Sequence, residues 1–81
     1  MIIHVTQNDI ENGIKGNCEF CPVAIAMTRA FGRLVRVWND HCLIGYSPVI
    51  RIDTPAEVAD FISDFDAFGE KGLKPFSFEI K

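Results

Sequence analysis

The residues best suited to chemistry are three cysteines and two histidines in a chain of 81 residues. Cys18 and Cys21 form a C-x-x-C motif, and His41-Cys42 follows further along the chain. These are the donor types of a structural zinc site, with His4 as an alternative ligand. A second C-x-x-C is missing. Because neighbours on a strand point to opposite faces, His41 and Cys42 converge on a metal only if they lie in a turn.

The same motif allows two other interpretations. As a redox pair, Cys21 would gain thiolate character from the N-terminus of the helix that starts there, although the motif does not directly follow a strand, as it does in thioredoxin-like sites. As packing groups, the cysteines would be small buried side chains, which is how free cysteines commonly behave. We favour packing and expect no bound cofactor. An odd number of cysteines also argues against a disulfide framework.

No set of nucleophile, base and orienting group is recognisable around the two histidines. Asp60 and Asp64 are one helical turn apart, as ordinary surface residues often are. Gly13 and Gly16 do not form a phosphate-binding loop, because they stand apart and do not directly follow a strand. We therefore predict that the protein is not an enzyme.

A second group of residues is suited to binding, and it lies around the segment Trp38-Asn39-Asp40-His41. Tryptophan and tyrosine dominate binding hot spots, and exposed loops carry function. Nearby arginines on the adjoining strands could pair with carboxylates or phosphates. The alternative is that Trp38 packs into the core and the arginines only solvate the open face of a sheet. The predicted binding residues are Trp38, Asn39, Asp40, His41, Arg33, Arg36, Tyr46 and Arg51.

The net charge of −3 is unevenly distributed. Between Ile52 and Glu70 there are six acids and no base, and the rest of the chain carries eight bases and five acids. Scattered bases and a negative total argue against direct binding of nucleic acid. The acidic run is typical of the solvated side of a helix, and it could also face a basic partner.

The hydropathy of the sequence predicts a protein that is not inserted in a membrane. No stretch reaches the roughly 18 consecutive apolar residues that span a bilayer, and no secretory signal is visible. Together with the odd number of cysteines, this predicts a protein of the reducing cytoplasm that does not act at a membrane.

Helix caps and hydrophobic periodicity define the elements that must position these residues. Thr6 with Asp9 imitates a capping box, and Gly13 is expected to end that short helix in the left-handed conformation. Cys21-Pro22 starts a second helix with a cap and a proline at its first position. Thr54-Pro55-Ala56-Glu57 does the same for a third, with Thr54 as the cap. We predict strands over 2–5, 33–38, 41–46, 49–52 and 76–81, and helices over 6–12, 21–31 and 54–68.

This order of elements predicts the fold class. It is β-α-β-β-α-β with a short extra helix after the first strand, in a single α+β domain over residues 1–81. The natural architecture is a mostly antiparallel sheet with its helices packed on one face. A ferredoxin-like arrangement satisfies the same order.

A pattern extends over nearly the whole chain: Val5-Thr6, Ile10, Gly13, Cys21-Pro22-Val23-Ala24-Ile25-Ala26, Phe65-Asp66 and Lys74-Pro75-Phe76-Ser77-Phe78-Glu79. In this pattern the chain resembles short uncharacterised proteins encoded by bacteriophages and prophages. The resemblance implies no settled activity. It implies a phage accessory protein in the host cytoplasm that acts by binding, for example as an inhibitor of a host enzyme or as an anti-defence factor.

Three functions are compatible with these observations. The first is a non-enzymatic protein that binds a host protein through the open sheet face and the Trp38–His41 turn, or through the acidic helix. The second is an oligomer, a homodimer for example, that sequesters a small molecule or nucleotide with arginines at a subunit interface. The third is a minor zinc or redox protein that uses Cys18, Cys21, His41 and Cys42.

Overall fold

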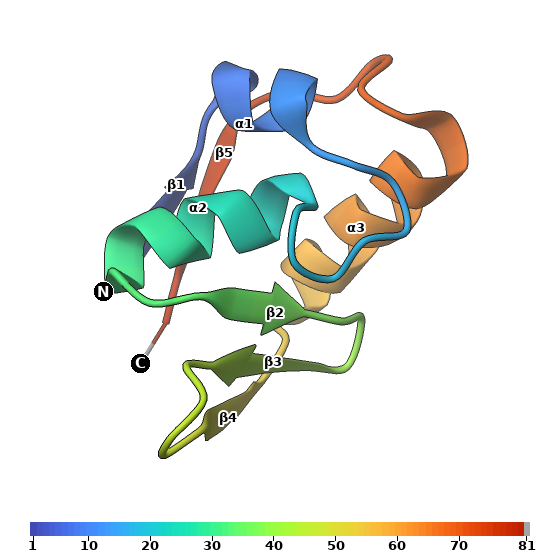
Figure 1. Cartoon of the computed structure of the whole chain (residues 1–81). Helices are drawn as coiled ribbons and strands as arrows, with labels where there is room; N and C mark the ends of the chain where they lie inside the picture. Colours follow the sequence, from blue (N-terminus) through green and yellow to red (C-terminus); the bar gives the residue numbers. More distant parts are fainter. Residues whose placement is uncertain (81) are drawn as a thin grey trace.

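The computed structural model describes residues 1–80 and confirms the α+β class (Figure 1). The elements follow the predicted order approximately, because three strands, and not two, lie between the second and third helices. Within residues 1–80, no helix is both long enough and apolar enough to cross a membrane. The elements are β1 (Ile2–Val5), α1 (Gln7–Asn12), α2 (Pro22–Phe31), β2 (Val35–Val37), β3 (His41–Ile44), β4 (Ile50–Asp53), α3 (Ala56–Phe68) and β5 (Phe76–Glu79).

The strands are antiparallel, as predicted, and they form two separate sheets. β1 pairs with β5 in a two-stranded sheet, in which Ile3 lies opposite Phe78. β2, β3 and β4 form a three-stranded sheet in chain order, in which Val37 lies opposite Cys42. The strands therefore do not join into the continuous sheet that a ferredoxin-like arrangement would have.

The free edge of β2 is closed by other parts of the chain, which helps to explain the division into two sheets. In an antiparallel ladder, successive residues direct their N–H groups alternately to one side and to the other. The N–H of Val35 donates to Oγ1 of Thr28 at 3.0 Å, and the N–H of Val37 donates to the carbonyl of Cys18 at 2.8 Å. No further strand can join the sheet at β2.

The helix α2 lies between the two sheets and contacts β1 on one side and β2 on the other (Figure 1). It can do so because it is apolar on most sides and because the small side chains of its alanines allow the neighbouring strands to approach closely. Val23, Ala24 and Met27 are completely buried, and burial of a side chain the size of valine or methionine contributes about 1.5–3 kcal/mol. The core is completed by Val58, Phe61, Ile62 and Phe65 of α3 and by Ile3, Val5, Val35, Val37, Cys42, Ile44 and Phe78 of the strands.

Two of the predicted helix starts are confirmed. The hydroxyl of Thr6 accepts a hydrogen bond from the N–H of Asp9 at 3.1 Å, and the Asp9 carboxylate accepts one from the N–H of Thr6 at 2.9 Å. This is the reciprocal capping box. At the start of α2, Sγ of Cys21 accepts a hydrogen bond from the N–H of Ala24 at 3.4 Å, and Pro22 occupies the first helical position.

Two other helix signals act differently from the prediction. Gly13 is extended (φ −69°, ψ 152°) and not left-handed. It is a glycine because a Cβ there would lie 2.5 Å from Cδ of Pro22. Thr54 does not cap α3, whose N-cap is Pro55 without a side-chain hydrogen bond. The hydroxyl of Thr54 donates instead to the carbonyl of Trp38 at 2.7 Å, a partner that is distant in the sequence.

A buried carboxylate joins α1, α2 and β1. Asp9 is 1% exposed, and each of its two carboxylate oxygens accepts a hydrogen bond of 2.8 Å from the guanidinium of Arg29. The same guanidinium donates to the carbonyl of His4 at 3.1 Å. Burial by itself raises the pKa of Asp9, but the hydrogen bonds from Arg29 and Thr6 outweigh it and hold the pKa below its usual value.

We expect Asp9→Asn to lower the free energy of unfolding at pH 7 by about 1.5–3 kcal/mol, because it removes charge-assisted hydrogen bonds from a buried site. A depressed pKa in the folded state means that the contribution of Asp9 is complete above the unfolded pKa of about 3.9 and is lost as the pH falls through the folded value. The difference between wild type and variant should therefore shrink below about pH 4. Urea unfolding at several pH values measures both effects.

Glu11→Gln is the matched control, because Glu11 is an exposed carboxylate on the same helix. It should change the stability by no more than about 0.5 kcal/mol. Equal losses in the two variants would contradict the role assigned to Asp9.

Candidate functional site

Most of the predicted binding residues lie on the solvent side of the three-stranded sheet. Val37 and Cys42 point into the core, and the residues that alternate with them, Arg36 and His41, are partly exposed. The register sets Arg36 opposite Leu43 and Leu43 opposite Arg51, so these three side chains form a row across the strands. We use the name outer sheet face for the surface formed by Arg36, Trp38, His41, Leu43, Tyr46, Arg51 and Asp53.

Aromatic rings hold the centre of the outer sheet face in place. The rings of Trp38 and His41 stack with their centroids 4.7 Å apart and their planes 14° from parallel. The guanidinium of Arg36 lies 5.9 Å from the ring centroid of Trp38 and 5.1 Å from that of Tyr46. Each such cation–π contact contributes about 0.5–1 kcal/mol at an exposed site. The ring of Tyr46 remains accessible, with 63% of the residue exposed.

The turn that joins β2 to β3 is held by its own side chains and by α3. The N–H of Trp38 donates to the carbonyl of His41 at 2.8 Å, which closes the turn. The carboxylate of Asp40 lies 2.7 Å from Nδ1 of His41, and this hydrogen bond lowers the pKa of Asp40. The amide of Asn39 donates to Oγ of Ser63 on α3 at 3.0 Å. The turn therefore presents a defined conformation.

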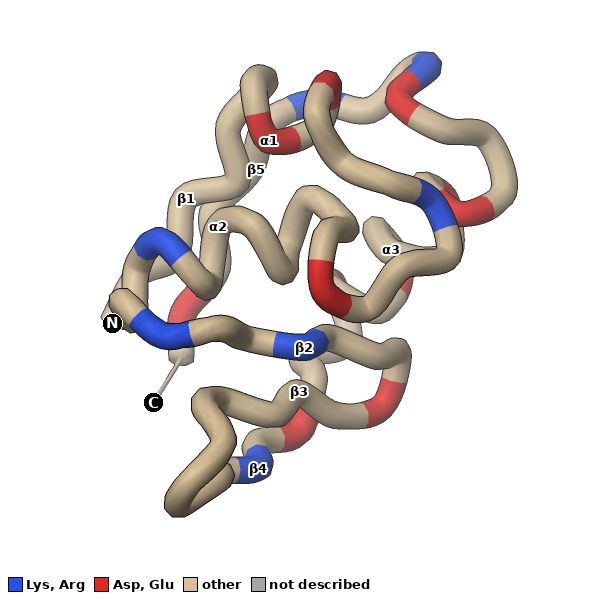
Figure 2. Tube along the Cα trace, in the orientation of Figure 1, with Lys and Arg blue, Asp and Glu red and all other residues tan. Residues whose placement is uncertain are grey.

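The three predicted binding arginines differ in the polar groups that their guanidinium groups contact. Arg51 forms an exposed ion pair of 3.1 Å with Asp53. Within residues 1–80, no carboxylate lies within ion-pair distance of Arg36. Arg33 lies at the other end of the strand pair, where its guanidinium donates to the carbonyl of Pro48 at 3.4 Å. Figure 2 shows these basic positions on β2, on β4 and ahead of β2.

The structure thus separates the predicted binding residues into two sets. The first set shares the outer sheet face or its turn, and the second set points elsewhere: Asn39 towards α3 and Arg33 towards the 45–48 turn. The first set is Trp38, Asp40, His41, Arg36, Tyr46 and Arg51.

Sequence reasoning missed Leu43 and Asp53. Leu43 lies at the centre of the face between two arginines, and Asp53 lies opposite His41. A signal for Leu43 was available, because a two-residue turn at 39–40 fixes the register and sets residue 43 opposite residue 36.

The four candidate zinc ligands are not brought together. Cys42 is 1% exposed and points into the core, whereas His41 stacks on Trp38 on the outer sheet face. The alternative ligand His4 lies on β1, where its Nδ1 is 2.8 Å from Oγ of Ser77. Within the described part of the chain, no three His, Cys, Asp or Glu side chains are close enough to hold a metal ion. The zinc hypothesis has no geometric support.

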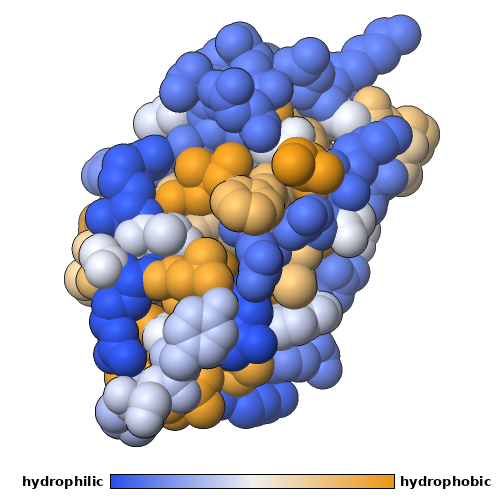
Figure 3. Space-filling view, viewed as in Figure 1, coloured by the Kyte–Doolittle hydropathy of each residue, from blue (hydrophilic) through white to orange (hydrophobic). Residues whose placement is uncertain are grey.

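The loop that precedes α2 is fixed at several points and presents apolar side chains. The N–H of Ile14 donates to the carbonyl of Phe20 at 2.8 Å, which closes the loop. The carboxylate of Asp66 accepts a hydrogen bond of 2.9 Å from the N–H of Gly16. Ile14 and Phe20 are both exposed, and Figure 3 shows hydrophobic side chains at the surface over this part of the molecule.

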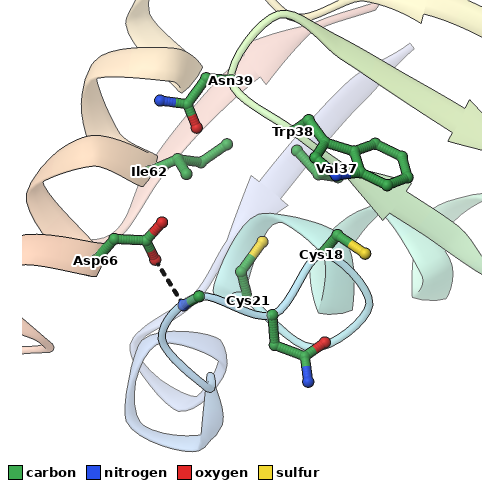
Figure 4. A pocket seen from close by; sticks show the side chains of 9 residues that line it. Cys18, Cys21, Val37, Trp38, Asn39, Ile62 and Asp66 are labelled. Atoms are coloured by element: carbon green, nitrogen blue, oxygen red, sulfur yellow. Dashed lines mark hydrogen bonds between the residues drawn. The ribbon is translucent and has the colours of Figure 1, made fainter.

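Cys18 and Cys21 line a pocket of about 180 Å³ between this loop, the β2–β3 turn and α3 (Figure 4). The pocket is smaller than the roughly 300–1,000 Å³ of typical ligand sites. Cys21 is only 3% exposed, and its burial raises the pKa of the thiol to about 11. Burial also raises the pKa of Cys42.

The raised pKa of Cys21 argues against the redox interpretation. In that interpretation the N-terminus of α2 would give Cys21 thiolate character, but desolvation outweighs that effect because the sulfur is buried. A thiol with a raised pKa is a poor nucleophile. The geometry therefore favours the packing interpretation of Cys21 and Cys42.

Comparison with protein families, with characterised proteins and with solved structures gives no match to this chain. The class defined by fold and site is a small α+β protein whose exposed sheet face carries ordered aromatic and basic side chains.

We expect iodoacetamide at pH 8 to modify Cys18 well before Cys21 and Cys42 in the folded protein. A thiol whose pKa is raised from 9.0 to about 11 carries roughly 100-fold less thiolate at this pH, and burial restricts access further. Peptide mass spectrometry over time gives the three rates. In denaturant all three cysteines should react at similar rates. Modification of Cys21 as fast as Cys18 in the native state would contradict the assignment.

Proposed function

We propose that the protein is a non-enzymatic accessory protein of the phage type that binds a host protein through the outer sheet face and thereby inhibits or modulates it. The observation that carries this proposal is the guanidinium of Arg36, which is ordered between the rings of Trp38 and Tyr46. Arginine, tryptophan and tyrosine are the residue types that dominate binding hot spots.

Order in the free protein supports a binding role for this face. Fixing a rotamer-rich side chain at an interface costs about 0.5–1.5 kcal/mol. Trp38 is already stacked on His41, and Arg36 is already placed over two rings. Most of the conformational entropy of these side chains is therefore lost on folding and not on binding.

The chemistry of the face indicates the kind of protein surface that would fit. Arg36 lacks a carboxylate within ion-pair distance among residues 1–80, so the partner would supply one, with the bidentate geometry that arginine favours. Leu43 and the ring of Tyr46 offer apolar contact beside it. Arg51 and Asp53 belong to the polar rim, where ion pairs are screened by solvent.

The acidic helix α3 is less suited to be the main contact. Its solvent side carries Glu57, Asp60 and Asp64, all exposed. Aspartate and glutamate are depleted at the core of protein interfaces. We therefore assign the primary contact to the outer sheet face.

We expect Arg36→Gln and Trp38→Ala each to weaken capture of the host partner at least about 30-fold, which corresponds to the 2 kcal/mol that defines a hot spot. The measurement is affinity capture from a bacterial lysate, followed by titration with the protein that is recovered. Asp64→Asn on α3 is the matched control and should bind like the wild type. Circular dichroism and thermal unfolding verify that each variant is folded.

Two outcomes would contradict the proposal. In the first, capture is unaffected by the outer-face variants and is lost with Asp64→Asn, which would move the contact to α3. In the second, native mass spectrometry of the wild type reveals a retained small molecule that Arg36→Gln no longer holds. That result would favour sequestration of a small ligand.

A further inference from the structure

The edge of the three-stranded sheet at β4 is open. Figure 1 shows β4 as the last strand of this sheet, and among residues 1–80 no further strand pairs with it. The edge at β2 differs, because its N–H groups are bonded to Thr28 and Cys18. An unpaired strand edge is a template for pairing with another chain, and proteins usually protect it.

The backbone groups at this edge can be assigned from the ladder. The N–H of Thr54 donates to the carbonyl of Asp40 at 3.2 Å, so residue 54 is directed towards β3. Because direction alternates along an antiparallel strand, Ile52 is also directed towards β3, and Arg51 and Asp53 are directed outwards. Among residues 1–80, the N–H and carbonyl groups of β4 that have no backbone partner are therefore those of Arg51 and Asp53.

The side chains of the same two residues have opposite charges and lie on one face. Both belong to the outer sheet face, and both are largely exposed, with side-chain exposures of 57% for Arg51 and 87% for Asp53. If β4 pairs with β4 of a second copy about a two-fold axis at Ile52, Arg51 of each copy lies opposite Asp53 of the other. This is also the register in which the outward backbone groups meet, giving about four hydrogen bonds.

Neighbouring registers are unfavourable. A two-fold axis at Arg51 sets the two copies of Arg51 against each other, and an axis at Asp53 does the same for the carboxylates. Like charges directly opposite one another destabilise a strand pair. The charge pattern of β4 therefore favours one symmetric register.

The inner side of the edge offers apolar surface for the same contact. Ile50 is 49% exposed, although strand alternation and its position opposite the buried Ile44 set its side chain on the core side of the sheet. Beside the edge lies a groove of about 520 Å³ that is lined by Ile52, Asp53, Pro55, Glu79 and Ile80. In the register centred on Ile52, the inner isoleucines of a second copy would lie next to this groove and would cover its apolar part.

We propose that the protein forms a symmetric dimer through β4, in which the two three-stranded sheets join into one continuous antiparallel sheet. The occupant of the open edge is a second copy of this chain, because the edge is complementary to itself in charge and in backbone direction. The two-fold axis is perpendicular to the joined sheet, so both outer sheet faces lie on the same side. Such a dimer presents two identical faces in parallel, which allows bivalent attachment. The dimer does not depend on the proposed host-binding function.

Charge reversal tests this dimer. Arg51→Asp alone places carboxylates opposite carboxylates, and Asp53→Arg alone places guanidinium groups opposite each other. Each single variant should raise the dissociation constant of the dimer at least about tenfold. An equimolar mixture of the two single variants should dimerise again, because every pair across the interface is then of opposite charge. The double variant Arg51→Asp/Asp53→Arg should also dimerise.

Sedimentation velocity from about 1 µM to about 1 mM measures these equilibria, and native mass spectrometry distinguishes the mixed dimer by mass. Asp60→Arg on α3 is the control and should leave the dimer intact. Circular dichroism confirms that the exposed substitutions do not unfold the chain. A wild type that stays monomeric throughout this range overturns the proposal. So does a dimer that persists in both single variants, or a mixture that fails to dimerise.

Discussion

The ion pair between Asp9 and Arg29 is the interaction on which the arrangement of this molecule depends. One guanidinium binds both oxygens of a buried carboxylate and the carbonyl of His4, so it ties α1, α2 and β1 together. Only the carboxylate of this ion pair is buried, since the side chain of Arg29 is 52% exposed. The pair is weak evidence for net stability, because desolvation of the carboxylate offsets much of the attraction. Its directional hydrogen bonds do fix the position of α2 relative to β1.

The position of α2 determines which surfaces of the three-stranded sheet are occupied by the rest of the chain. Thr28 of α2 and Cys18 of the preceding loop occupy the edge of β2, and the apolar side of the sheet is used by the core. Two features of the sheet remain open to other molecules, the outer face and the edge of β4. The outer face carries the proposed binding surface, and the edge of β4 carries the proposed dimer interface.

The caps, the turn and the strand alternation could be predicted because each is set by residues close together in the sequence. Thr6 with Asp9 and Cys21 with Pro22 act within one helical turn. The two-residue turn at 39–40 defines which side chains share the outer sheet face. These local rules were sufficient to place Trp38 beside Arg36.

The remaining features depend on partners that are distant in the sequence. A threonine ahead of a proline can cap the following helix, or its hydroxyl can bind elsewhere. Only the three-dimensional position of Trp38 shows that the hydroxyl of Thr54 donates to the carbonyl of Trp38. The pKa of Cys21 is subject to two opposing effects, because the helix N-terminus lowers it and burial raises it. Only the packing around the sulfur shows that burial prevails. The division into two sheets likewise depends on which strand edges other segments occupy.

If the outer sheet face is the contact surface, Trp38, the single tryptophan of the chain, lies within the contact and reports on it directly. The measurement is a two-dimensional nitrogen–proton NMR spectrum of the labelled protein, recorded with and without its unlabelled host partner. We predict that the indole N–H signal of Trp38 shifts together with the amide signals of Arg36 and Leu43, while the amide signals of α3 do not change. Shifts confined to α3, with the indole signal unchanged, would contradict it.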